Sequence, residues 1–93
     1  PDQYSLSQNY PNPFNPTTSI GFGLPEASRV AVRVYDIAGR EVNTLFEGDL
    51  GAGFSSVQWD GRNASGETLS SGVYYYTILA NDYVETRKMT LMK

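Results

Sequence analysis

The chain has 93 residues, with 7 basic and 10 acidic side chains and a formal net charge of −3. This length corresponds to a single domain with a thin core, since a chain of about 100 residues buries only about 60–65% of its unfolded surface. Its arginines are scattered along the chain, so neither nucleic acid nor an anionic membrane is an expected partner. The absence of His and Cys removes the usual general base, the thiol nucleophile and most transition-metal ligands.

The first 17 residues contain four of the five prolines in the chain. Proline fixes φ and pushes the preceding residue towards an extended conformation, so this segment is not helical. We therefore expect a rigid extended arm at residues 1–17, packed on the edge of a β-sandwich domain at residues 18–93. Its expected anchors are Leu6, Tyr10 and Phe14.

From residue 18 the hydrophobic residues alternate with period two, which predicts half-buried strands. The expected inward residues of the first two strands are Ile20, Phe22, Leu24, Val30, Val32 and Val34. A turn at residues 36–40 follows, with Gly39 at positive φ. The return strand is expected from Val42 to about Phe46, before a glycine-rich loop at residues 47–53.

The next strand is expected at residues 54–60, where Phe54, Val57 and Trp59 do not share one parity, which predicts either a β-bulge or a late start of the strand. A turn cluster at residues 60–66 precedes a very short strand at Leu69.

Residues 73–80 are apolar on both faces, which predicts a central strand covered on both sides, with Val73 and Tyr75 among its buried residues. A tight two-residue turn at Asn81-Asp82 leads into the last strand, at residues 83–93. The expected inward residues of that strand are Met89 and Leu91.

This arrangement predicts an all-β fold, an immunoglobulin-like antiparallel β-sandwich of about seven strands. Turn residues recur every 8–12 residues, as in that class of sandwich, and no segment has helical periodicity. The expected core residues are Val30, Val32, Val34, Trp59, Val73, Tyr75 and Leu91.

Three groups of residues could form a functional site or have a purely structural role. Asp36 and Asp60 are the best carboxylate pair for glycoside hydrolysis, but each lies in a turn sequence where Asp usually bonds its own backbone. The loop from Asp60 to Glu67 is rich in oxygen ligands, although its spacing does not match a calcium-binding loop and favours an Asx-rich turn. Three consecutive tyrosines at 74–76 cannot all face one sugar, which favours packing. We therefore expect no catalytic residue, metal, cofactor or small-molecule substrate.

Four segments, in order along the chain, resemble the type A C-terminal sorting domains of type IX secretion. They are residues 6–18 with Pro11, Asn12, Pro13 and Phe14, residues 34–42 with Asp36, Gly39 and Arg40, residues 71–76 with Gly72 and Tyr74, and residues 86–93 with Arg87, Lys88 and Lys93. A second resemblance overlaps with the first. Residues 59–66, followed by Gly72-Val73-Tyr74, are similar to the immunoglobulin-like domain of the flagellar hook-capping protein.

The first resemblance implies a non-catalytic sorting domain at the end of an exported cargo protein, read by an outer-membrane translocon and removed by a sortase-like peptidase. It implies a secreted or cell-surface location, reached through the periplasm of a Gram-negative bacterium, and a monomeric domain. A start at Pro1 is interpreted as a piece cut from a longer protein. The expected recognition residues are Arg87, Lys88, Lys93, Gly72 and Tyr74, the first three on the free polar face and end of the last strand.

Two alternatives stay open. One is a structural immunoglobulin-like module, of hook-cap type or acting as an adhesive spacer, and the other is a carbohydrate-binding module.

Overall fold

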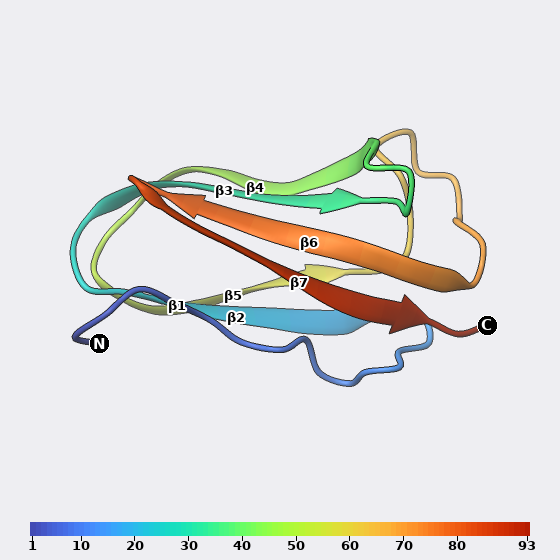
Figure 1. Cartoon of the computed structure of the whole chain (residues 1–93), viewed down its shortest axis with the longest axis horizontal. Helices are drawn as coiled ribbons and strands as arrows, with labels where there is room; N and C mark the ends of the chain where they lie inside the picture. The colour runs from blue at the N-terminus through green and yellow to red at the C-terminus, as the bar shows by residue number, and fades with distance from the viewer.

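The computed structural model describes all 93 residues and contains seven strands and no helix, so no helix crosses a membrane. The strands are β1 (Ser5–Leu6), β2 (Thr18–Leu24), β3 (Ser28–Tyr35), β4 (Glu41–Leu50), β5 (Gly53–Trp59), β6 (Gly72–Ala80) and β7 (Tyr83–Leu91). They form two antiparallel sheets, β1-β2-β5 and β4-β3-β6-β7, which face each other as the layers of a sandwich (Figure 1). The predicted fold class is therefore confirmed.

The period-two residues of β2, β3 and β7 form the core, as predicted, because alternate side chains of a strand point to one face. The buried inward residues of these three strands are Ile20, Phe22, Leu24, Val30, Val32, Val34, Met89 and Leu91, each at most 2% exposed. Both tight turns are also confirmed, with Gly39 at φ 82° and Asn81 at φ 52°. Asn tolerates this left-handed conformation better than most residues, which suits it to the first position of the hairpin turn.

Trp59 is the centre of an aromatic cluster that joins both sheets and the arm. The Phe14 ring lies tilted against it at 5.6 Å between centroids, and the Tyr74 ring meets it edge-on at 5.3 Å. The indole N–H donates to the Arg62 carbonyl at 2.9 Å, so the one polar atom of the buried ring has a partner.

The prediction for β6 was wrong about the buried face. Tyr75 is 38% exposed and Val73 is half-buried, whereas Tyr74 and Tyr76 are buried. The strand is central in its sheet, between β3 and β7, but no further layer covers the outer face of that sheet. Because apolar residues stand at both parities of β6, sequence alone does not show which face meets the other sheet.

Two boundary predictions were also wrong. Strand β4 continues to Leu50, opposite Ser28, because it stays paired with β3 through Gly48, which lies opposite Val30. Leu69 belongs to no strand; its N–H donates to the Gly61 carbonyl, and the adjacent isolated bridge joins Arg62 to Thr68.

The bulge and the late start expected in β5 are both absent, since β5 begins at Gly53 and pairs with β2 in continuous register as far as Trp59. Phe54 instead points to solvent, 79% exposed, and lies against the outer side of Gly23. Its parity differs from that of Trp59 because it belongs to the outer face.

The arm is an integral part of the sandwich. Its β1 strand pairs with β2, and Leu6 and Phe14 are buried at 3% and 1% exposure. Tyr10 does not anchor the arm through its side chain, which is 81% exposed, because its backbone pairs with Ser19 and turns the ring outward. The change in composition at residue 17 therefore does not separate two structural units, because the arm and the strands after it share one core.

The arm closes the open side of the sandwich between β2 and β7. The Tyr76 hydroxyl donates to the Ser7 carbonyl at 2.6 Å and accepts from the Asn9 N–H at 2.8 Å. Further along, the Phe14 N–H donates to the Thr90 carbonyl, and the Met92 N–H donates to the Phe14 carbonyl. These bonds tie residues near the start of the chain to its last strand.

Replacing Phe14 with Ala should therefore lower the free energy of unfolding by about 3–5 kcal/mol, through lost burial and the cavity left beside Trp59. Urea unfolding followed by tryptophan fluorescence measures the change. Tyr10→Ala, in the same arm, is the matched control and should cost no more than about 0.5 kcal/mol. Equal stability of the Phe14 variant and the native chain would show that the arm is not part of the core.

Candidate functional site

Two segments that are distant in sequence meet at one end of the sandwich and line a hollow of about 320 Å³, here called the end hollow. One is the turn after β3, and the other is the segment leading into β6. The lining residues include Asp36, Ile37, Ala38, Arg40, Leu69, Ser71, Gly72 and Tyr74. The structure thus brings together parts of the 34–42 and 71–76 segments.

Asp36 holds the turn side of the end hollow. One carboxylate oxygen accepts from the backbone N–H groups of Ala38 and Arg40, and the other accepts from Arg40 Nε at 3.0 Å. The backbone bond from Arg40 is the main cause that keeps the pKa of Asp36 below its usual value. The carboxylate is therefore a turn-forming group.

Tyr74 supports the other side of the end hollow from below. Its ring is buried against Trp59, and its hydroxyl donates to the Ser70 carbonyl at 2.7 Å. Gly72 has a φ of 148°, which lies in the range that disfavours side chains. Both residues shape the loop, and neither offers a free polar group to a partner.

Ile37 is the residue of this hollow that sequence reasoning missed. Its side chain is 77% exposed although it is fully apolar, and the exposed Arg40 lines the same hollow. An apolar residue in the middle of an otherwise small and polar turn was the available signal in the sequence. Ile37 and Arg40 are the lining residues that a partner protein reaches most easily.

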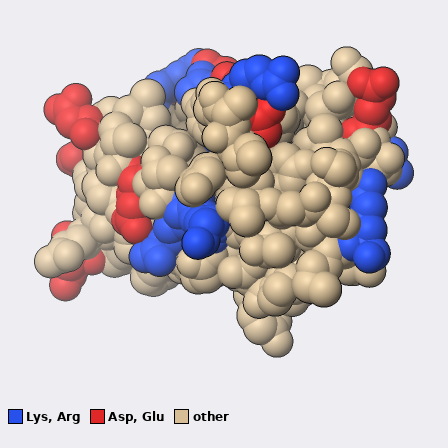
Figure 2. Space-filling model, turned by 45° about the vertical axis from the view of Figure 1, so that its right-hand side comes forward, with Lys and Arg blue, Asp and Glu red and all other residues tan.

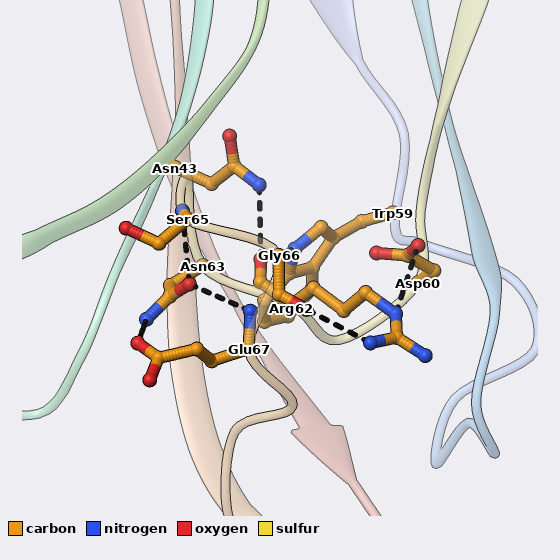
Figure 3. A network of polar contacts seen from close by, with 8 residues as sticks. All are labelled: Asn43, Trp59, Asp60, Arg62, Asn63, Ser65, Gly66 and Glu67. Carbon is orange, nitrogen blue, oxygen red and sulfur yellow. Dashed lines mark hydrogen bonds and ion pairs between the residues drawn. The ribbon is translucent and has the colours of Figure 1, made fainter.

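The loop after β5 satisfies its polar groups internally (Figure 3). Asn63 Oδ1 accepts from the N–H groups of Ser65 and Glu67, and Asn63 Nδ2 donates to the Glu67 carboxylate. The Arg62 side chain pairs with Asp60 and donates to the Gly66 carbonyl. This is the geometry of an Asx-centred turn, and the structure contains no cluster of three or more His, Cys, Asp or Glu side chains placed to hold a metal.

The two carboxylates weighed as a catalytic pair are not brought to one cleft. Asp36 lines the end hollow and is paired with Arg40, whereas Asp60 lines a different hollow and is paired with Arg62. Each carboxylate therefore has its own arginine and its own surroundings.

The proline-rich motif has mainly structural contacts. The Pro11 carbonyl accepts from Asn9 and Thr18 side chains, and Asn12 Oδ1 accepts from the Thr90 N–H at 3.0 Å. Pro13 is exposed, and the adjacent Phe14 is buried. The motif thus fixes the arm against β7.

The basic residues of the last strand do not share one face. Lys88 and Lys93 are exposed, as expected, and the Lys93 N–H donates to Ser71 Oγ. The placement of Arg87 on the free polar face was wrong. It lies on the inward parity of β7, donates to the Leu6 carbonyl at 2.9 Å and pairs with Glu85 at 3.1 Å.

Charge does not mark a binding face on the surface in view in Figure 2, where Lys and Arg alternate with Asp and Glu around a broad uncharged area. Charged side chains of β3 also pair with those of β4, as Arg29 does with Asp49 and Arg33 with Glu41.

The fold and the end hollow define a small immunoglobulin-like module, in which the polar side chains of the loops bond mainly to groups of the same loops. The model of the FlgD Ig-like domain family matches residues 7–83, so the chain belongs to that family. It is 37% identical over 67 residues to the basal-body rod modification protein FlgD of Salmonella typhimurium, covering 71% of this chain and 29% of that protein. The Escherichia coli protein of the same name is 36% identical over 67 residues. The chain therefore spans less than a third of the length of these relatives.

Solved structures extend the comparison. FlgD from P. aeruginosa superposes with a TM-score of 0.63 at 32% identity, covering 80% of this chain and 58% of that one. Dimeric latent PorU from Porphyromonas gingivalis superposes with a TM-score of 0.76 at 19% identity, covering 97% of this chain and 9% of that one. PorZ from the same organism superposes with a TM-score of 0.63 at 20% identity, covering 99% of this chain and 12% of that one. The comparisons support both resemblances seen in the sequence, the PorU and PorZ likeness being one of fold.

Two tyrosines near the arm, the buried Tyr76 and the half-buried Tyr83, predict a loss of stability at alkaline pH. Burial is the main cause that raises the pKa of Tyr83 from 10.0 to about 12, and its hydrogen bond to Glu85 adds to the shift. Burial also raises the pKa of Tyr76. In the folded protein these two hydroxyls lose their protons less readily than in the unfolded chain. Their contribution to stability is therefore complete below the ordinary tyrosine pKa, and it is lost as the pH rises through the raised pKa of the folded state.

The free energy of unfolding should therefore fall as the pH rises from 10 towards 12, measured by urea titration at each pH. Tyr83→Phe should make this decline less steep, because one of the two shifted groups is gone. A free energy of unfolding that stays constant across this range in the native chain would contradict the prediction.

Proposed function

We propose that this chain is a non-catalytic, protein-binding module of the hook-cap type, which contributes a folded surface to an assembly outside the cytoplasm. The observation that carries the proposal is the family match over residues 7–83. It is supported by relatives named as basal-body rod modification proteins. The side chains that sequence reasoning offered for chemistry are bonded within their own turns, which agrees with a structural role.

The end hollow is the surface we assign to this role. It is formed by two loops on the rigid sandwich, so its shape is fixed by strands on either side. It exposes an apolar side chain, Ile37, and a charged one, Arg40. An apolar contact with a charged neighbour is a common composition for the centre and rim of a protein interface.

A chimera tests this proposal. Residues 1–93 would replace the immunoglobulin-like part of Escherichia coli FlgD, and swimming of a strain lacking its own FlgD would be scored. Restored swimming is expected, and Ile37→Asp should reduce it while changing stability by no more than about 0.5 kcal/mol, since the side chain is exposed. A chimera that is produced as a stable, folded protein and restores nothing would count against a hook-cap role.

A second candidate is a type IX sorting domain, favoured by the way the Pro-Asn-Pro-Phe segment is bonded to the last strand. Asn12 and Phe14 both bond Thr90, so two of the segments that resemble sorting domains form one unit. The likeness to PorZ, titled a surface component of the type IX secretion system, covers 99% of the chain. Under this proposal the partners are the outer-membrane translocon, a sortase-like peptidase and an upstream cargo domain, and the protein is secreted or at the cell surface.

The sorting proposal is tested by fusing residues 1–93 to a periplasmic reporter in a host with type IX secretion. Lys88→Glu with Lys93→Glu should lower export with little change in melting temperature, because both side chains are exposed. Leu91→Asp, which places a charge in the core, should abolish folding and export together. Normal export of both the charge variant and a chain lacking its last few residues would exclude the terminal strand as the signal.

A further inference from the structure

Strand β5 forms the one sheet edge of this protein that has none of the usual protections. Native edge strands are protected by short length, bulges, inward-pointing charges or cover from another segment. Strand β1 has only two residues, and the ladder of β4 with β3 has two register shifts. Strand β7 has Glu85 and Arg87 on its inward face and is bonded by the arm. Strand β5 is seven residues long, pairs with β2 in continuous register, and contains no proline and no charged residue.

The backbone groups along the outer edge of β5 have no partner within the chain. Ser19 and Gly21 of β2 bond the arm, so the even-numbered residues of β2 bond β5. The partners of those residues are the odd-numbered residues of β5. The N–H and carbonyl groups of Phe54, Ser56 and Gln58 therefore point away from the sheet, and no hydrogen bond within the chain reaches them.

The inner face of β4 extends past β5, because the two sheets differ in width. The larger sheet has four strands and the smaller one three, and the bond from Arg87 Nε to the Leu6 carbonyl places β1 beside β7. The difference of one strand therefore falls at β4. Incomplete cover is visible there, since β4 is the only strand without a buried residue, although its Leu45 and Phe46 pack against the core.

A hollow of about 360 Å³, here called the side hollow, lies between β4 and β5. Its lining includes Leu45 of β4 and Gln58 of β5, and the buried Trp59 forms part of its wall. The loop after β5 bounds one end of it, where the Arg62 carbonyl accepts from Asn43 of β4 (Figure 3). A segment laid along this side would bond the β5 edge and at the same time cover the half-buried side chains of β4.

The chemistry of this side defines the segment that fits it. The inward side chains of an added strand would meet Leu45, Phe46 and Val57, which are apolar and half-buried, so alternate positions should be apolar. The chain has a net charge of −3 and β5 has no charged residue, so the segment should be basic or neutral rather than acidic.

A second copy of this chain does not fit the same place. If β5 paired with β5 of a second copy, the overhanging β4 strands of both copies would meet, and each carries Glu41, Glu47 and Asp49. In addition, every register of β5 with itself is free of charge, so nothing would select one of them.

We propose that the β5 edge is a strand-addition site for an extended segment of another protein, with apolar side chains at alternate positions and basic or neutral side chains between them. The segment pairs antiparallel with β5 as a fourth strand of the smaller sheet, opposite β4. The arm is the precedent within this chain, since its β1 strand completes the other edge of the same sheet in this way. This surface differs from the end hollow, and the inference depends on neither proposed function.

An NMR titration of the 93-residue chain with a synthetic peptide tests the proposal. The peptide has the sequence of residues 28–35, with valine at alternate positions, two arginines on the other face and no acidic residue. The amide signals that shift should be those of β5 and of the facing part of β4. Ser56→Pro should weaken binding roughly tenfold or more, because it removes the central N–H donor. That N–H is not used in the ladder with β2, so the variant should keep its fold. Ser56→Thr is the matched control, which keeps the donor and should bind like the native chain.

Two N-methylated peptides give a second measurement that leaves the protein unchanged. Methyl groups on the nitrogens at the positions of Ala31 and Arg33 block the peptide edge that faces β5, so this peptide should lose binding. Methyl groups at the positions of Val32 and Val34 block the opposite edge, so this peptide should bind like the unmodified one.

Three results would overturn the proposal. One is a peptide that does not bind at millimolar concentration, and another is equal binding of the two methylated peptides. The third is a chain that dimerises by itself in sedimentation velocity and loses the dimer with Ser56→Pro, because the edge would then belong to a second copy. Binding that a folded Ser56→Pro variant leaves unchanged would place the peptide elsewhere and would also contradict the proposal.

Discussion

Closure of one side of the sandwich by the arm is the constraint on which the rest of the structure depends. Two stacked sheets leave a seam between their edge strands, and here residues 5–14 fill it. The buried hydroxyl of Tyr76 bonds the arm backbone at Ser7 and Asn9, and Phe14 supplies the ring that meets Trp59. Because buried polar groups are costly without partners, the hydroxyl and the arm require each other.

The same closure connects the core to the end hollow and to the edge of β7. Tyr74 packs on Trp59 and bonds Ser70, so the aromatic cluster under the arm also supports the loop beside the end hollow. Side chains of β7 contact the arm along the strand, as Tyr83 does with Tyr4, but the arm bonds the backbone edge of β7 only from Lys88 onward. A module built in this way presents its loops on a rigid frame, which suits the proposed role as a protein-binding module.

Much of the fold is a local property of the sequence and was predictable for that reason. Alternation at Val30, Val32 and Val34 fixes an inward face, and turn residues such as Gly39 and Asn81 fix where strands reverse. The end hollow was only half predictable. Its turn was expected at residues 36–40, but the exposed Ile37 and the meeting with the segment near Gly72 depend on how the strands pair.

The sequence by itself determined that this protein is an all-β sandwich without the usual catalytic side chains, because strand period and residue type are local. Tertiary structure decided which parity of β6 is buried, since Tyr74 and Tyr75 are equally apolar and only the opposing sheet distinguishes them. It also decided that Arg87 bonds the Leu6 carbonyl and that half of the β7 edge stays open. The last two outcomes depend on the path of the arm. Its contacts join residues about 80 positions apart, which no local sequence pattern can show.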